Sequence, residues 1–261
     1  MKIIVVLKMV PDVVEELEVA ADGKALDTEY LRLIANELDT QALEEALLLK
    51  EKYGGTVAVV ALDAPEVDDA LFTALAKGAD QAFKVADGDA ALSTRAGAYR
   101  LAQALSSVPG LLPADLILTG AQAIDDLDGL TAPLLSHLLR LPQLGIVTQV
   151  SVDTASGIAT VLREFAGGVR GEYEIKLPAM LGIQAAEKPP RYVPVAKVLA
   201  ARKSKAIQSV PAPTMADGGW PVLQIEQMAK PEVTEHAQML QGTPEEIANQ
   251  LCEILAARGL V

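Results

Sequence analysis

One loop holds the residues best suited to chemistry. It follows an apolar run at residues 116–119 and reads Gly120-Ala121-Gln122-Ala123-Ile124-Asp125-Asp126-Leu127-Asp128-Gly129-Leu130-Thr131. Gly120 allows a tight turn, and the Gln122 amide can bind the edge of an adenine or a ribose. Residues 129–131 can present N–H groups and a hydroxyl at the start of a helix, where anions bind. These residue types in this order predict a nucleotide pocket.

The three acids of this loop, Asp125, Asp126 and Asp128, allow two other interpretations. They could only cap the helix predicted at residues 129–141, because carboxylates stabilise the positive end of a helix dipole. They could also bind Mg²⁺, although magnesium sites usually take their ligands from separate segments and from substrate phosphate. Spacing alone leaves capping and nucleotide binding open.

The sequence contains none of the usual motifs for dinucleotide or triphosphate binding, metal binding or covalent catalysis. The chain has no G-x-G-x-x-G and no G-x-x-x-x-G-K-[ST] motif, so the usual dinucleotide and triphosphate loops are absent. His137 and His236 are its only histidines and Cys252 is its only cysteine, which excludes an internal disulfide and a histidine or cysteine metal cage. We therefore expect no catalytic residue, no metal site and no Ser-His-Asp or Cys-His arrangement.

Composition excludes further classes. The 261 residues carry 22 Lys and Arg against 35 Asp and Glu, a formal charge of −13, and only 3% are aromatic. This charge repels phosphate backbones and few rings are present to stack on bases, so nucleic acid is not expected as a partner. The apolar run at residues 3–7 is too short for a signal peptide, and no stretch is apolar enough to span a membrane. We expect a soluble, cytoplasmic protein.

The elements that must position the loop alternate along the chain. Apolar runs at residues 3–7, 56–62, 81–85 and 116–119 predict strands, and helical patterns at residues 40–53, 67–77, 93–107 and 129–141 separate or follow them. This order predicts an α/β fold with a doubly wound, mostly parallel sheet, a Rossmann-like nucleotide-binding fold. Ligands of such sheets lie beyond the carboxyl ends of the strands, where the loop lies.

The pattern changes after Pro142. Runs at residues 146–152, 158–165, 171–176 and 179–184 predict an antiparallel or mixed extension of the sheet. Periodicity is absent from about residue 188 to 240, and Thr243-Pro244-Glu245-Glu246 then predicts a capped helix through about Ala257. We divide the chain into an α/β domain, residues 1–187, and an extended C-terminal arm, residues 188–261. The arm is expected to wrap another chain, with a disordered tail as the alternative.

Several motifs give the chain a resemblance to a known family. They are Lys8-Met9-Val10-Pro11-Asp12, Asn36-Glu37-Leu38-Asp39, Leu43-Glu44-Glu45-Ala46-Leu47, Thr73-Ala74-Leu75-Ala76-Lys77-Gly78-Ala79-Asp80, the loop from Gly120, Arg163-Glu164-Phe165-Ala166-Gly167-Gly168, Leu177-Pro178-Ala179 and Pro190-Arg191-Tyr192. Their order and spacing over residues 1 to about 205 resemble the β subunit of electron-transfer flavoproteins.

The resemblance implies a redox carrier subunit and not a free-standing enzyme. In this family an α subunit forms a heterodimer with the β subunit and holds FAD, and electrons pass from dehydrogenases, such as the acyl-CoA type of fatty acid β-oxidation, to a quinone oxidoreductase or another acceptor. The β subunit binds AMP in ordinary members and a second FAD in bifurcating members, which oxidise NADH. An alternative of another class is a stand-alone adenine-nucleotide-binding regulatory module.

The resemblance also implies site residues. Nucleotide contacts would fall at Val6, Asn36, Glu37, Leu38, Asp39, Leu62, Ala123, Ile124, Asp125, Asp126, Leu127, Asp128, Gly129, Leu130 and Thr131. Recognition of dehydrogenases would fall on residues 193–205 after Tyr192, with Val195 as the apolar anchor and Lys197, Arg202, Lys203 and Lys205 around it. The acids of the loop, with no lysine or arginine between Gly120 and Thr131, favour AMP over the pyrophosphate of FAD.

Overall fold

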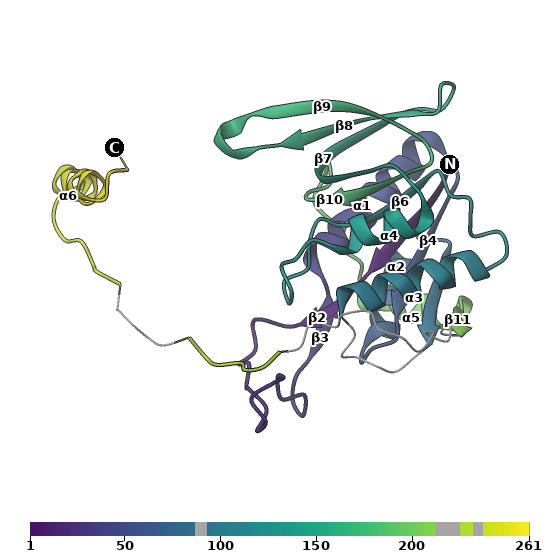
Figure 1. Ribbon diagram of the computed structural model, residues 1–261, viewed down its shortest axis with the longest axis horizontal. Helices are drawn as coiled ribbons and strands as arrows, with labels where there is room; N and C mark the ends of the chain where they lie inside the picture. The colour runs from purple at the N-terminus through teal and green to yellow at the C-terminus, as the bar shows by residue number, and fades with distance from the viewer. Residues whose placement is uncertain (87–92, 212–224, 232–236, 261) are drawn as a thin grey trace.

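A nine-stranded sheet forms the centre of the computed structural model, which describes residues 1–86, 93–211, 225–231 and 237–260 (Figure 1). Its strand order is β11-β5-β4-β1-β6-β10-β7-β8-β9. The strands are β1 (Lys2–Leu7), β4 (Thr56–Leu62), β5 (Gln81–Ala86), β6 (Leu116–Gly120), β7 (Gln143–Asp153), β8 (Ile158–Glu164), β9 (Arg170–Lys176), β10 (Ala179–Ile183) and β11 (Ile207–Pro211). The pairs from β11 to β7 are parallel and the β7-β8-β9 pairs are antiparallel. The predicted fold class and the antiparallel extension are confirmed.

Helices cover both faces of the parallel part. They are α1 (Glu37–Tyr53), α2 (Val67–Lys77), α3 (Thr94–Ser107), α4 (Thr131–Leu139) and α5 (Val195–Ser204). Ile3, Val5 and Leu7 of β1 pack in one core with α1 and α2, whereas Ile4 and Val6 pack in the other core with α3 and α4. Both faces of β1 are thus buried, which explains why its sequence is a continuous apolar run and does not alternate.

Two helix starts differ from the sequence prediction. Helix α1 begins at Glu37 and not at residue 40, so the motif at residues 36–39 supplies the N-cap Asn36 and the start of the first turn. Helix α4 begins at Thr131, two residues later than predicted, because Gly129 has a positive φ of 61°. Both differences place polar groups at the carboxyl ends of β1 and β6.

A small hairpin next to β1 was not predicted. Its antiparallel strands, β2 (Met9–Pro11) and β3 (Leu33–Ala35), follow β1 and precede α1. The Asn36 N–H donates to the Lys8 carbonyl over 2.8 Å and continues this pairing. The hairpin therefore returns the chain to the end of β1 at the point where α1 starts.

The range expected to lack regular elements contains two. Helix α5 and strand β11 lie between residues 188 and 240, where no helix or strand was expected. Strand β11 pairs in parallel with β5, from Ile207 opposite Ala82 to Pro211 opposite Ala86, and Ala201 of α5 is buried in the core shared with α2. Strand β11 therefore extends the sheet at its edge, and α5 packs in the same core as α2. The domain boundary at residue 187 stays a prediction.

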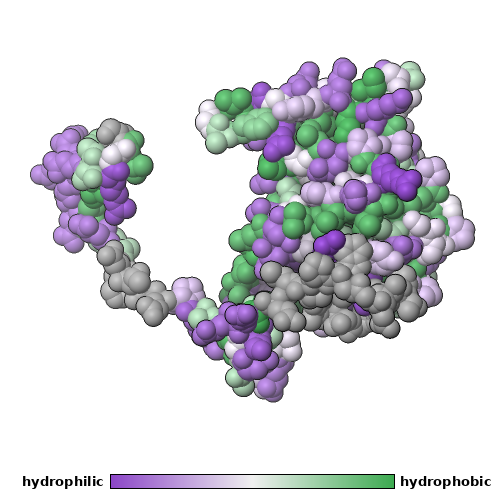
Figure 2. Space-filling view, viewed as in Figure 1, coloured by the Kyte–Doolittle hydropathy of each residue, from purple (hydrophilic) through white to green (hydrophobic). Residues whose placement is uncertain are grey.

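The predicted C-terminal helix is present as α6 (Pro244–Ala257). Its capping box is complete: the Thr243 hydroxyl accepts from the Glu246 N–H at 3.3 Å, and the Glu246 carboxylate accepts from the Thr243 N–H at 2.8 Å. Figure 1 shows α6 apart from the sheet, and Figure 2 shows hydrophobic residues beside the charged ones on its surface. No residue of α6 is buried against the described part of the chain.

Candidate functional site

The connectivity of the sheet has a switch point between β1 and β6. From β1 the chain adds β4 and β5 on one side and then returns to place β6 on the other side. The helices that follow β1 and β6 leave toward opposite faces, so the carboxyl ends of these two strands open a crevice between them. The loop that carries the predicted nucleotide site follows β6 into this crevice.

Asp39 joins the ends of the two strands. Its buried carboxylate accepts the Lys8 N–H at 2.8 Å and the Gly120 N–H at 2.6 Å, so one side chain from the first turn of α1 holds β1 and β6 together. Burial raises the pKa of Asp39 to about 6, although the two backbone bonds oppose that rise. A Cβ on Gly120 would lie 2.7 Å from the Asp39 carboxylate, so this position needs glycine.

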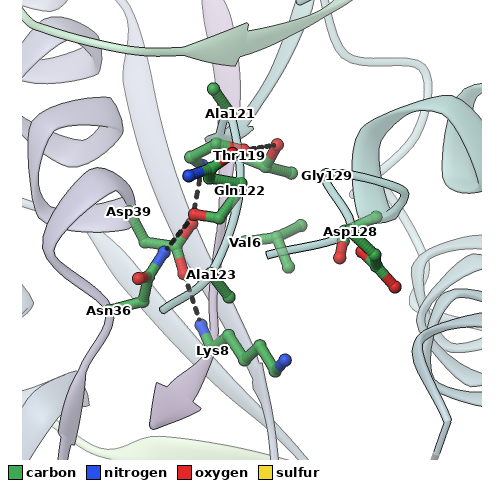
Figure 3. A pocket seen from close by; sticks show the side chains of 12 residues that line it. Val6, Lys8, Asn36, Asp39, Thr119, Ala121, Gln122, Ala123, Asp128 and Gly129 are labelled. Carbon is green, nitrogen blue, oxygen red and sulfur yellow. Dashed lines mark hydrogen bonds between the residues drawn. The ribbon is translucent and has the colours of Figure 1, made fainter. Parts of the chain in front are cut away.

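Asn36 fixes the loop that follows β6. Its side-chain nitrogen donates to the Gln122 carbonyl over 2.9 Å (Figure 3). The side chain is buried, and the bond joins residues far apart in the sequence. Asn36 and Asp39 therefore hold the ends of β1 and β6 and the loop after β6 in place in the chain without ligand.

A small pocket of about 20 Å³ lies in this crevice. Its lining residues come from β1, the start of α1, and the segment from β6 to α4: Val6, Lys8, Asn36, Asp39, Thr119, Gly120, Ala121, Gln122, Ala123, Asp128, Gly129 and Thr131. Figure 3 shows Asn36 and Asp39 on one side of the pocket and Asp128 and Gly129 on the other, with Val6 between them. Its wall combines polar side chains and backbone groups with a larger share of apolar surface.

A second pocket, of about 130 Å³, adjoins the first. The two share Val6, Lys8 and Thr131, and the second extends past the end of β4 to the first turns of α3. Its other lining residues are Leu7, Met9, Leu33, Leu62, Asp63, Ala64, Ser93, Thr94, Gly97, Ala98 and Leu101. Both pockets have more apolar than polar wall, and they meet at a common border.

The predicted nucleotide residues divide into three groups. Those that line the first pocket are Val6, Asn36, Asp39, Ala123, Asp128, Gly129 and Thr131, and Leu62 lines the second. Glu37 and the side chains of Ile124, Leu127 and Leu130 are exposed, and Leu38 packs beside Gly120. Asp125 and Asp126 bind Lys8. The structure thus brings most of the set to one place, and their contact with a nucleotide stays a prediction.

Lys8 was missed as a candidate site residue. Its ammonium lies 2.7 Å from Asp125 Oδ1 and 2.6 Å from Asp126 Oδ2. Burial lowers the pKa of Lys8, but the bonds to the two aspartates outweigh this effect and the net shift is upward. The sequence did not indicate this role because Lys8 is more than a hundred residues from the two aspartates that it binds.

The three acids do not cap α4. Asp128 Oδ1 accepts the Leu130 N–H at 2.8 Å in the turn before the helix, and none of the described side chains bonds an N–H of the first turn of α4 as its cap. Asp125 and Asp126 instead bind Lys8 and, for Asp126, the Thr94 hydroxyl at 3.2 Å. Across the described ranges, no group of three or more His, Cys, Asp or Glu side chains is placed to hold a metal ion. The structure gives the magnesium interpretation no support.

The predicted recognition residues lie on and before α5. Tyr192 is 84% exposed, Val195 69% and Leu199 53%, and Lys197 and Lys203 are also exposed. Together, Tyr192, Val195 and Leu199 form an exposed apolar patch, which we call the α5 patch.

Two of the predicted cations instead attach α5 to α2. Arg202 pairs with Asp69 and lies over the Phe72 ring, 5.3 Å from its centre. The Lys205 ammonium donates to the Ala79 carbonyl over 2.8 Å. The free cations next to the α5 patch are therefore Lys197 and Lys203, as far as the described residues show.

Four side chains of α1 hold the segment that leads into α5. Gln41 accepts from the Ala186 N–H at 3.1 Å, and Glu45 accepts from the Glu187 N–H at 2.9 Å. Glu44 accepts the Arg191 N–H and its guanidinium, with a closest distance of 2.7 Å, and the same guanidinium reaches Glu51 at 2.6 Å. The Leu43-Glu44-Glu45-Ala46-Leu47 and Pro190-Arg191-Tyr192 motifs are therefore in contact, and their polar residues serve to position α5.

The fold and the crevice define a doubly wound α/β protein of the Rossmann type, with two adjoining pockets at its switch point. Residues 24–215 match the family model described as electron transfer flavoprotein domain. With the relatives that follow, this match shows that the chain belongs to the electron transfer flavoprotein β subunit family.

Curated relatives agree over most of the chain. The electron transfer flavoprotein subunit beta of Methylophilus methylotrophus is 30% identical over 266 residues and covers 98% of both chains. The protein of the same name from Bacillus subtilis is 30% identical over 264 residues, 100% of both chains. That of Syntrophomonas wolfei is 35% identical over 204 residues, 78% of this chain and 77% of the relative. The family resemblance in the sequence is thus confirmed. Within the described residues, none of the helices is long and apolar enough to cross a membrane.

Proposed function

We propose that this chain is the β subunit of a heterodimeric, cytoplasmic electron-transfer flavoprotein and that it binds AMP at the switch point. FAD, held mainly by the α subunit, supplies the electron-carrying chemistry. Electrons come from dehydrogenases, such as the acyl-CoA type of fatty acid β-oxidation, and go to a quinone oxidoreductase or another acceptor. The observation that carries the AMP proposal is the pair of adjoining pockets at the carboxyl ends of β1 and β6.

The side chains around the two pockets support separate places for the base and the phosphate of AMP. The second pocket has aliphatic walls, including Leu62, Ala98 and Leu101, which suit the flat faces of a base. Thr131 lies on the border of both pockets and opens α4, so its hydroxyl and the nearby N–H groups can bind a phosphate. A nucleotide with its base in the second pocket and its phosphate at Thr131 uses both.

Two exposed surfaces support the proposed partners. The apolar residues of α6, among them Leu251 and Leu255, are exposed and suit the α subunit that the family implies. The α5 patch, flanked by Lys197 and Lys203, suits an apolar pocket with an acidic rim on a dehydrogenase.

The nucleotide content of the purified α–β complex tests the proposal. We expect the complex to be yellow and the β chain alone to be colourless, and acid extraction followed by chromatography should give one FAD and one AMP per heterodimer. Stoichiometric flavin on the isolated β chain would contradict this expectation. A chain that purifies alone with a bound adenine nucleotide, and never with an α subunit, would instead support the stand-alone regulatory module.

A second FAD in this subunit is the other candidate, with NADH as the electron donor of a bifurcating complex. The border that the two pockets share favours it, because a ligand longer than AMP can extend across both. Lys8 also supplies a cation near the acidic loop, which the loop itself lacks. The same extraction decides between the two: two FAD and no AMP would replace the AMP proposal with bifurcation.

A further inference from the structure

Lys8 occupies the border between the two pockets. It lines both of them, as Thr131 does. Its backbone N–H is fixed by Asp39, while its side chain extends toward the side of Asp128 (Figure 3). Its ammonium therefore lies next to the place where the proposed function puts a phosphate.

A polar network holds this ammonium in the chain without ligand. Lys8 binds Asp125 and Asp126, and the Thr94 hydroxyl donates to Asp128 Oδ2 over 2.7 Å and also bonds Asp126. The network thus links the end of β1, the loop before α4, and the start of α3. The side chains of Lys8, Asp125 and Asp126 keep 34%, 29% and 22% exposure, so water and ions can reach them.

The charges around the border are unbalanced without Lys8. Asp125, Asp126 and Asp128 all lie on the loop that leads to Thr131, and a phosphate there would be repelled by them. Among the described residues that line either pocket, Lys8 is the only lysine or arginine. A lysine ammonium has three donors on a flexible stem, so it can bind a phosphate oxygen and keep one aspartate.

We propose that Lys8 is the residue that makes this site select a phosphorylated adenine nucleotide over the free nucleoside. The phosphate at Thr131 takes one of the bonds that the Lys8 ammonium makes to Asp125 and Asp126. This inference rests on the proposed nucleotide site, and it adds the group that recognises the charge of the ligand.

Calorimetric titration of the nucleotide-free full chain with AMP and with adenosine tests this role. Wild type should bind AMP more tightly than adenosine, and Lys8→Met should reduce that ratio about tenfold or more while adenosine affinity stays the same. Lys8→Arg should keep most of the ratio. Lys84→Met is the matched control, because Lys84 also pairs with two aspartates, Asp63 and Asp68, but lines neither pocket.

The aspartates separate direct contact from simple neutralisation. The Asp125→Asn/Asp126→Asn variant should raise AMP affinity, because it releases the ammonium and removes repulsion. Adding Lys8→Met to that variant should again lower the ratio of AMP to adenosine affinity. If the triple variant keeps the ratio of the double variant, Lys8 only neutralises the acids and the inference is wrong. Binding of neither ligand would overturn the proposed AMP site itself, whereas an unchanged ratio in Lys8→Met would overturn only the role of Lys8.

Discussion

At the scale of single residues, Glu45 makes the fold sensitive to pH. Its carboxyl is 1% exposed and accepts the Glu187 N–H, and burial raises its pKa to about 7 from an ordinary value of 4.5. The folded chain therefore binds this proton more tightly than the unfolded chain does. The contribution of Glu45 to the free energy of unfolding is greatest at low pH and falls as pH rises from about 4.5 to about 7.

Glu45→Gln should remove this dependence. The amide keeps an oxygen that accepts the Glu187 N–H, but it does not titrate. The free energy of unfolding of the variant, relative to that of wild type, should therefore increase from about pH 5 to about pH 8, by at most roughly 3 kcal/mol. Urea unfolding across this range measures it. Glu37→Gln changes an exposed acid on the same helix and should give a constant difference. A constant difference for Glu45→Gln as well would show that this carboxyl titrates normally.

The candidate site shows how far single residues can be interpreted from sequence. Gly120, Gln122 and Thr131 are neighbours in the chain, and their types predicted a pocket that the structure places at the switch point. The bonds from Asp39 to Gly120 and from Lys8 to Asp125 join positions 81 and 117 residues apart. No local pattern signals such pairs, because only the folded sheet brings them together.

At the scale of elements, the pair Arg191–Glu44 fastens the segment before α5 to α1. Glu44 is only 3% exposed, and Arg191 is its ion-pair partner. Arg191→Ala should lower the free energy of unfolding by about 3 kcal/mol, since it leaves a buried carboxylate without its partner. Urea unfolding measures this loss. The exposed pair Arg170–Glu164 provides the control, because Arg170→Ala should cost less than about 1 kcal/mol.

A second variant checks the cause of that loss. Glu44→Gln in the Arg191→Ala background should recover part of the stability, because the remaining side chain no longer carries a buried charge. An equal loss in the single and double variants would indicate that Arg191 acts through packing alone.

Helix α5 shows why some elements escaped prediction. Only Ala201 of its ten residues is buried, and its apolar residues Val195 and Leu199 point to solvent. A helix held by Arg202, Lys205 and one small residue has no apolar stripe for a sequence pattern to detect. By contrast, α1 and α2 bury long apolar faces, and their positions were predicted closely.

The two free lysines of α5 should control the encounter with a dehydrogenase. Lys197→Ala/Lys203→Ala should slow electron transfer at low salt by reducing the association rate, with little difference at high salt, because such attraction is screened. Stopped-flow reduction of the α–β complex at two ionic strengths measures this. Lys176→Ala, at the end of β9, is the control and should have no effect. Loss of rate that is independent of salt would exclude electrostatic steering at α5.

At the scale of the whole molecule, α6 should matter to assembly and not to the fold of the chain. Deletion of residues 237–261 should leave the midpoint of urea unfolding of the isolated chain unchanged, because no residue of α6 is buried against the described part of the chain. The same deletion should weaken binding of the α subunit, measured by co-purification and calorimetry.

Point variants show which face of α6 is used. Leu251→Asp/Leu255→Asp should weaken α-subunit binding as the deletion does, since these exposed side chains lie four residues apart on one face. Asn249→Asp/Ala256→Asp adds the same charge elsewhere on the helix and should bind normally. A lower unfolding midpoint in the isolated deletion variant would mean that α6 packs on its own chain.

The architecture could be predicted from the sequence because strands that are buried on both faces appear as unbroken apolar runs. The strands at β1, β4 and β6 appear in the sequence as such runs, and the helices between them fix their parallel direction. The β2–β3 hairpin was not readable, since its six residues include only one buried side chain, Val10.

The link that Asp39 makes between β1 and β6 bears on the thermodynamics of ligand binding. Because both N–H groups are already bonded to this carboxylate, the floor of the crevice is organised in the empty chain and little backbone entropy remains to be lost. The heat-capacity change on nucleotide binding should then match the apolar area that the ligand covers and show no extra term from folding. Calorimetric titration at several temperatures measures this heat-capacity change. A value that matches the covered apolar area would indicate that the site is rigid before the nucleotide binds.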